Sequence, residues 1–173
     1  KLGNSIIGVQ NLITSIELFE HLEKPYVTGK IVLVDDWNIL DDINFSGTEI
    51  FTLRLSGAGK GVDEYFRYKF IINKVIKSEK INDRTEVYTL SLIDRTAYLS
   101  AANRFSKSYT GKIEEIITNI VSSELGKKVN KGPKASAQPK LKVIIPFMSP
   151  LAACDWLKSS MTTTNGSPWF LFS

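Results

Sequence analysis

Three carboxylates near the start of the chain have a spacing that could do acid–base chemistry. Glu17, Glu20 and Glu23 could supply the acid and the base of a glycosidase, an enzyme class that places two carboxyl groups around the bond it cleaves. Residues 13–22 alternate as a strand does, so the three side chains are split between opposite faces. No apolar pocket that would raise a carboxyl pKa is evident around any of them. We therefore assign them no catalytic role.

The other acidic residues and the histidine also have simple structural interpretations. Asp35 with Asp36, and Asp41 with Asp42, lie where predicted elements end, so we interpret them as solvated turn and cap residues. His21 is the only histidine, so a multi-histidine zinc site or a histidine-based triad would need residues from outside this chain. The sequence predicts no catalytic, metal-binding or cofactor-binding residue, and the chain is not predicted to be an enzyme.

A glycine-rich segment at 57–61 surrounds Lys60 and has the composition of a phosphate-binding loop. The spacing of that motif, G-x-x-x-x-G-K-S/T, is absent, and no capped helix follows the segment. We interpret residues 57–61 as the tip of a hairpin.

Aromatic and basic residues alternate just after this tip. The aromatic set is Tyr65, Phe66, Tyr68 and Phe70, and the basic residues between them are Arg67 and Lys69. Such a run resembles the base-stacking platform of an oligonucleotide-binding barrel. Strand alternation explains it equally well, with Phe66, Tyr68 and Phe70 in a core and the two cations outside. We favour the core interpretation.

The elements that carry these residues are mainly strands. Alternating apolar residues predict strands over 13–22, 26–36, 49–56, 66–78 and 85–93, with a short helical crossover near 37–43. Turn residues such as Asn82 and Asp83 connect them. The predicted fold class is α+β, mainly β. A small antiparallel β-barrel or sandwich domain over 1–105 precedes the beginning of an α+β domain.

The second predicted domain, 106–173, is incomplete. It begins with the clearest helix of the chain, 111–126, followed by a basic loop at 127–140, a strand at 141–146, a helix at 150–161 and a strand at 168–173. One face of the first helix is apolar and predicts a buried stripe: Ile113, Ile116, Ile117, Ile120, Val121 and Leu125. Ser149 and Pro150 predict the start of the second helix. The chain stops after an aromatic run, so we expect a longer parent protein.

Composition limits the classes of function. The formal net charge of the 173 residues is +4, but six lysines fall in one acid-free stretch: Lys127, Lys128, Lys131, Lys134, Lys140 and Lys142. The linker-like composition between them favours a solvated loop over a polyanion contact, so nucleic-acid binding is disfavoured. No apolar run approaches the roughly 20 residues of a membrane helix. The only cysteine, Cys154, fits either a reducing compartment or a packed thiol.

Several segments together resemble one known family. They are 28–36 (TGKIVLVDD), 38–40, 47–49, 70–75, 88–92, 104–112 leading into the helix that ends at Gly126, 150–161 and 169–172. The pattern is similar to the baseplate hub proteins of T4-like contractile-tailed phages, which have relatives in type VI secretion and other contractile injection systems. The resemblance covers nearly the whole chain.

The resemblance implies a mechanical role in a virion. A hub subunit forms a homotrimeric ring in the tail baseplate, assembled in the host cytoplasm, and joins the tail tube protein to the central spike or tail lysozyme-like protein. Each chain of the family has two similar barrels, of which this sequence would hold the first. We hypothesise that edge strands within 13–34 form the tube-like face, so prolines at Ile16 and Leu33 should impair assembly.

Two alternatives belong to different classes. An oligonucleotide-binding barrel would bind single-stranded nucleic acid with a steep salt dependence. A carbohydrate-binding module would need exposed aromatic side chains such as Trp37 or Trp169. An enzyme would need active residues from beyond this chain.

Overall fold

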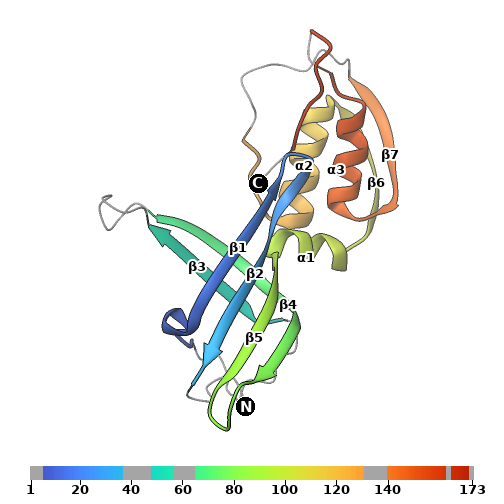
Figure 1. The fold of residues 1–173 in the computed structure, drawn as a ribbon. Coiled ribbons are helices and arrows are strands. Elements are labelled where there is room, and N and C mark those ends of the chain that lie inside the picture. Colours follow the sequence, from blue (N-terminus) through green and yellow to red (C-terminus); the bar gives the residue numbers. More distant parts are fainter. Residues whose placement is uncertain (1–5, 37–47, 57–64, 131–139, 163–164, 172–173) are drawn as a thin grey trace. The chain divides into compact units, whose positions relative to one another are not determined.

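The computed structural model describes residues 6–36, 48–56, 65–130, 140–162 and 165–171 (Figure 1). These residues divide into two compact units. Unit 1 comprises the described residues up to Phe19 and those from Val27 to Asp94. Unit 2 comprises Glu20–Tyr26 and the described residues from Arg95 onward. The predicted fold class, α+β and mainly β, is confirmed. The predicted boundary between residues 105 and 106 stays a prediction.

The strands of unit 1 form one antiparallel sheet that curls into an open half-barrel. A 3₁₀ turn, Gln10–Leu12, leads into β1 (Ile13–His21), followed by β2 (Lys24–Asp35), β3 (Ile50–Ser56), β4 (Tyr65–Lys80) and β5 (Glu86–Asp94). Their order in the sheet is β1-β2-β5-β4-β3, so β1 and β3 are its edges. β1 is therefore an edge strand, as the hypothesis for 13–34 requires, whereas β2 lies between two strands and is not one. That this edge forms a tube-like face stays a prediction.

One face of this sheet holds the core of unit 1. Ile31 and Leu33 of β2 lie opposite Leu90 and Tyr88 of β5, and all four side chains are buried. Period-two alternation puts the neighbouring residues on the other face, as expected for a sheet with one packed side. The buried cluster consists of Leu12, Val27, Ile31, Leu33, Phe51, Leu53, Phe70, Ile72, Tyr88, Leu90 and Leu92.

Two features let the sheet curl around this core. The pairing of β4 with β5 shifts between Ile72 and Lys74 and again between Val75 and Lys77, and each extra residue bends β4 and increases its twist. Gly29 allows β1 to approach β2 closely. A Cβ at this position would lie 3.1 Å from the carbonyl oxygen of Glu17 and 3.1 Å from a methyl carbon of Leu18.

Unit 2 packs helices against a two-stranded sheet. It contains α1 (Arg95–Ala102), β6 (Phe105–Gly111), α2 (Ile113–Leu125), β7 (Leu141–Met148) and α3 (Pro150–Ser159), and β6 pairs with β7 (Figure 1). All six apolar residues of the predicted helix stripe are buried in α2, which confirms that prediction. Gly126 ends the helix at φ 63°, a left-handed conformation that glycine adopts without steric cost.

The start of α3 uses a cap from another helix. Ser149 precedes Pro150 as predicted, but its side chain makes no capping hydrogen bond. Instead, the backbone N–H of Leu151 donates to Oγ of Ser100 in α1 at 2.9 Å, and Ser100 is buried. One of the four N–H groups that a helix start leaves without a helical partner is thereby satisfied.

The second half of the chain differs from its prediction at two strands. β7 extends through Pro146 to Met148, because the β6–β7 register shifts there and an irregular position tolerates a residue without an N–H. The predicted strand at 168–173 is represented in the described residues by a single bridge between Thr162 and Pro168. The predicted crossover at 37–43 lies outside the described residues. None of the described helices is long and apolar enough to cross a bilayer.

Candidate functional site

The described part of the chain contains no group of three or more His, Cys, Asp or Glu residues placed to hold a metal ion. His21 is exposed at the end of β1. Glu17, Glu20 and Glu23 are exposed as well, and the Glu17 carboxylate lies 3.8 Å from the Lys30 ammonium. These four side chains are therefore solvent-exposed on β1 and the turn that follows it.

One pair of carboxylates was missed by sequence reasoning. Asp35, predicted to be solvated, is only 1% exposed, because β2 continues to this residue and its side chain falls on the core face. Its partner across the sheet is Glu86 of β5. The two Glu86 carboxylate oxygens accept hydrogen bonds from the hydroxyls of Ser78 and Tyr88, the latter at 2.9 Å. Only the β2–β5 register reveals this pair, and its hydrogen bonds are those of a structural polar cluster.

Phe66, Tyr68 and Phe70 of β4 lie on the face of the sheet opposite to Arg67 and Lys69. The Tyr68 and Phe70 rings stack with centroids 5.8 Å apart, and Phe70 is fully buried. Arg67 and Lys69 occupy the intervening positions and are exposed. The core interpretation is confirmed for Phe70 but wrong for Phe66, which is 73% exposed. A base stacked on these aromatic rings would meet neither Arg67 nor Lys69 on the same face.

The exposed end of β3 and β4 instead forms an apolar patch. Leu55 is paired with Phe66 and lies two residues after the buried Leu53, on the same face of the sheet. At this end of the two strands, the face that packs in the core is exposed to solvent. Leu55 is 39% exposed. We call Leu55 and Phe66 the edge patch, because β3 is an edge strand of the sheet. Large apolar side chains in such a position are typical of an interaction surface.

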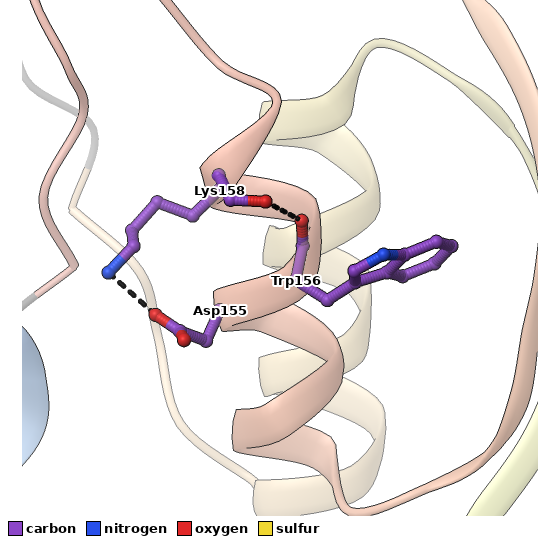
Figure 2. A network of polar contacts seen from close by, with 4 residues as sticks. Asp155, Trp156 and Lys158 are labelled. Atoms are coloured by element: carbon purple, nitrogen blue, oxygen red, sulfur yellow. Dashed lines mark hydrogen bonds and ion pairs between the residues drawn. The ribbon is translucent and has the colours of Figure 1, made fainter.

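Unit 2 also exposes large apolar side chains: Ile144, Phe147, Trp156 and Phe170. Figure 2 shows the Trp156 ring projecting from α3 on the side away from the Asp155–Lys158 ion pair, whose charged atoms are 2.7 Å apart. The Trp156 carbonyl oxygen accepts a hydrogen bond from the Ser159 hydroxyl at 2.7 Å. The buried positions Ala153, Cys154 and Leu157 define the packed face of α3, and Trp156 lies off that stripe.

Among the described residues, two titratable groups have a clearly raised pKa, and both are buried in unit 2. Burial, with a smaller contribution from the charge of Asp155, raises the pKa of the Cys154 thiol from 9.0 to about 12. Burial, followed by the charge of Glu124, raises the pKa of Tyr109 above its usual value. A thiol with such a pKa stays protonated near neutral pH and is a poor nucleophile.

The remaining sequence candidates are less informative. Residues 57–61, Trp37, Asp41 and Asp42 lie outside the described residues. Trp169 is half-buried and packs against the apolar cluster of unit 2. Of the lysines in the predicted basic loop, Lys127, Lys128 and Lys140 are described and exposed, as is Lys142 in β7.

Comparisons with known proteins add no assignment. No protein-family model matches this chain, and no curated protein matches it. The described residues offer surfaces as candidates for function, namely the sheet edges, the edge patch and the exposed apolar side chains of unit 2.

Proposed function

We propose that this chain is a structural subunit of a phage-tail baseplate hub, which assembles as a homotrimeric ring between the tail tube and the central spike. In this proposal it acts in the virion through its surfaces and catalyses no reaction. The observation that carries the proposal is the open five-stranded sheet of unit 1, with β1 at one edge and β3 at the other.

Free sheet edges favour association because each presents unpaired backbone N–H and C=O groups. The two edges are different strands, so a contact between β1 of one copy and β3 of the next would be head-to-tail. A head-to-tail contact forms a closed ring when its rotation closes. This geometry is compatible with a trimer, and the number three comes from the resemblance to hub proteins.

The edge patch would add apolar burial to such a contact. Full burial of a leucine or phenylalanine side chain contributes roughly 1.5–3 kcal/mol. Leu55 and Phe66 lie beside edge strand β3, so a strand that pairs with β3 could cover them. Backbone pairing would then set the register, and the edge patch would supply affinity.

The proposal is tested by the native mass of the full-length protein in solution, measured by light scattering. We expect a trimer, alone or with a co-purifying spike protein, and we expect Phe66→Ser to shift the equilibrium towards monomer. Ile81→Ser is the matched control, because Ile81 is 62% exposed in the turn between β4 and β5, away from the edge patch. Its trimer should persist.

Two results would contradict the proposal. One is a wild-type monomer that also fails to trimerise with the spike. The other is equal loss of trimer in both variants. Leu33→Pro is no longer a useful edge test, because Leu33 lies in an interior strand with its side chain in the core.

A further inference from the structure

Cationic side chains gather on the face of the unit 1 sheet opposite its core. The strand registers place six of them there: Lys30, Arg54, Arg67, Lys69, Lys74 and Lys77. Lys69 lies between Tyr68 and Phe70, which pack in the core cluster. Lys74 and Lys77 are paired with Ser91 and Thr89 of β5, whose neighbours along that strand are buried core residues. We call this set the basic face. It draws on three strands, with four of the six cations in β4, one in β2 and one in β3.

Hydroxyl side chains lie between these cations. Lys30 and Lys74 are both paired with Ser91 of the central strand β5, so they stand on either side of it, about 10 Å apart across two strand spacings. Lys69 is opposite Thr52, and Lys77 is opposite Thr89. The outer face therefore presents ammonium and hydroxyl groups side by side, with the apolar Ile71 between Lys69 and Lys74.

The positive charge of the basic face is only partly compensated. Glu17 lies 3.8 Å from Lys30, and Glu79 lies 2.5 Å from Lys77, but such exposed ion pairs are weak and are screened by salt. Arg67, Lys69 and Lys74 make no ion pair with the described residues.

Two of the cations face each other. Arg54 and Arg67 are directly opposite across β3 and β4, an arrangement of like charges that destabilises a sheet. An anionic ligand beside the two guanidinium groups would offset the repulsion between them.

We propose that the basic face binds the sugar–phosphate backbone of nucleic acid without sequence preference. Lysine, arginine, serine and threonine are the side chains that contact phosphates in such complexes. Protein–protein interfaces are instead depleted of lysine and serine and enriched in aromatic residues and arginine, whereas four of the six cations here are lysines. The composition of the face thus favours a polyphosphate over an acidic protein. The exposed aromatic Phe66 is on the other face, so binding depends on charge rather than on base stacking.

This inference is independent of hub assembly. The cations of the basic face are distinct from those of the lysine loop, and only the strand registers place them on one face. Because the contact is electrostatic, affinity should fall steeply with salt concentration and should be similar for single strands and duplexes.

The test is fluorescence anisotropy with the full-length protein and a labelled oligothymidine of about 30 nucleotides, long enough to follow a charged surface. A mixed-sequence duplex of the same length is measured in parallel. We expect binding that weakens between about 50 and 200 mM salt. The variant Arg67→Gln/Lys69→Gln/Lys74→Gln should bind at least tenfold more weakly, with its salt slope reduced by about 2 on single strands.

A matched variant, Lys127→Gln/Lys128→Gln/Lys140→Gln, removes the same charge from exposed lysines of unit 2. It should retain most of the affinity. An equal loss of affinity in the two triple variants would overturn the proposal, because it would show that binding depends on the net charge of the protein and not on the basic face. Absence of wild-type binding at 50 mM salt, or tighter binding of poly-glutamate than of the oligonucleotide, would overturn it as well. Circular dichroism of both triple variants shows whether they remain folded. The single variant Lys74→Gln, which changes the fold least, should still bind more weakly than the wild type.

Discussion

Cys154 is the residue whose chemistry is changed most by its surroundings. It is fully buried in the apolar cluster of unit 2, between neighbours that offer its thiolate no compensating charge. Burial makes the charged form costly, which is why the pKa of the thiol rises from 9.0 to about 12. The sequence interpretation of a packed thiol therefore agrees with the structure.

The raised pKa predicts how stability changes at alkaline pH. Below pH 9 the thiol is protonated in both states, so its full contribution to stability is present. As the pH rises from 9 towards 12, only the unfolded thiol ionises, and stability falls by up to about 1.4 kcal/mol per pH unit. Urea unfolding of the wild type and Cys154→Ala at pH 8 and pH 10.5 measures this.

The Cys154→Ala variant lacks the thiol, so it reports the pH dependence of every other group. The stability advantage of the wild type should shrink or reverse at the higher pH. A difference that stays constant between the two pH values would contradict the raised pKa.

Individual residues were predictable only where the local pattern decided their environment. Phe70 follows strand alternation into the core, as expected. Phe66 has the same pattern but lies where the core ends, and Asp35 has the type of a surface residue but lies where β2 still faces inward. The exposure of Phe66 and the burial of Asp35 depend on how far the neighbouring strands extend. That length cannot be predicted from the residues of one strand alone.

At the scale of elements, the contact between α1 and α3 shows how one helix completes another. Ser100 is 3% exposed, and its hydroxyl accepts the Leu151 N–H that would otherwise lack a partner at the start of α3. We predict that Ser100→Ala lowers the free energy of unfolding by about 1 kcal/mol, the usual value of a lost helix cap.

Chemical denaturation of Ser100→Ala and Ser149→Ala compares this cap with the residue that the sequence favours. Because the Ser149 side chain makes no capping hydrogen bond, its replacement should have the smaller effect. The reverse order would show that Ser149, not Ser100, caps α3.

The elements themselves were largely visible in the sequence. The stripe of α2 identified that helix because an amphipathic pattern over several turns has few other interpretations. The sequence did not predict that β7 extends past Pro146, or that residue 168 forms only an isolated bridge. Both features depend on whether a neighbouring strand pairs with the segment. The cap from Ser100 was missed for the same reason, as it joins residues 51 positions apart.

For the whole molecule, two separate apolar clusters imply two centres of stability. Leu90 belongs to the cluster of unit 1 and Ile120 to that of unit 2. Replacing either by alanine removes a buried side chain and should cost about 2–5 kcal/mol in its own unit. We predict that Leu90→Ala speeds amide hydrogen exchange mainly in β2 and β5, and Ile120→Ala mainly in α2 and α3, because each unit opens locally.

Hydrogen exchange resolved by mass spectrometry measures both variants. Equal acceleration in both units for either variant would mean that the chain unfolds as one cooperative body.

The division into a strand-rich first part and a mixed second part was predictable from the change in periodicity. The inclusion of Glu20–Tyr26 in unit 2 was not, because that segment lies far from the rest of the unit in sequence.

That inclusion has a topological consequence. The backbone passes from one unit to the other at three places, namely after Phe19, after Tyr26 and after Asp94. A single protease cut after Asp94 would break only the last of these crossings. The two fragments would still share unit 2, because the amino-terminal fragment carries Glu20–Tyr26 and the carboxy-terminal fragment carries the rest. The nicked protein should therefore remain a non-covalent complex, in the manner of a split protein whose halves complement each other.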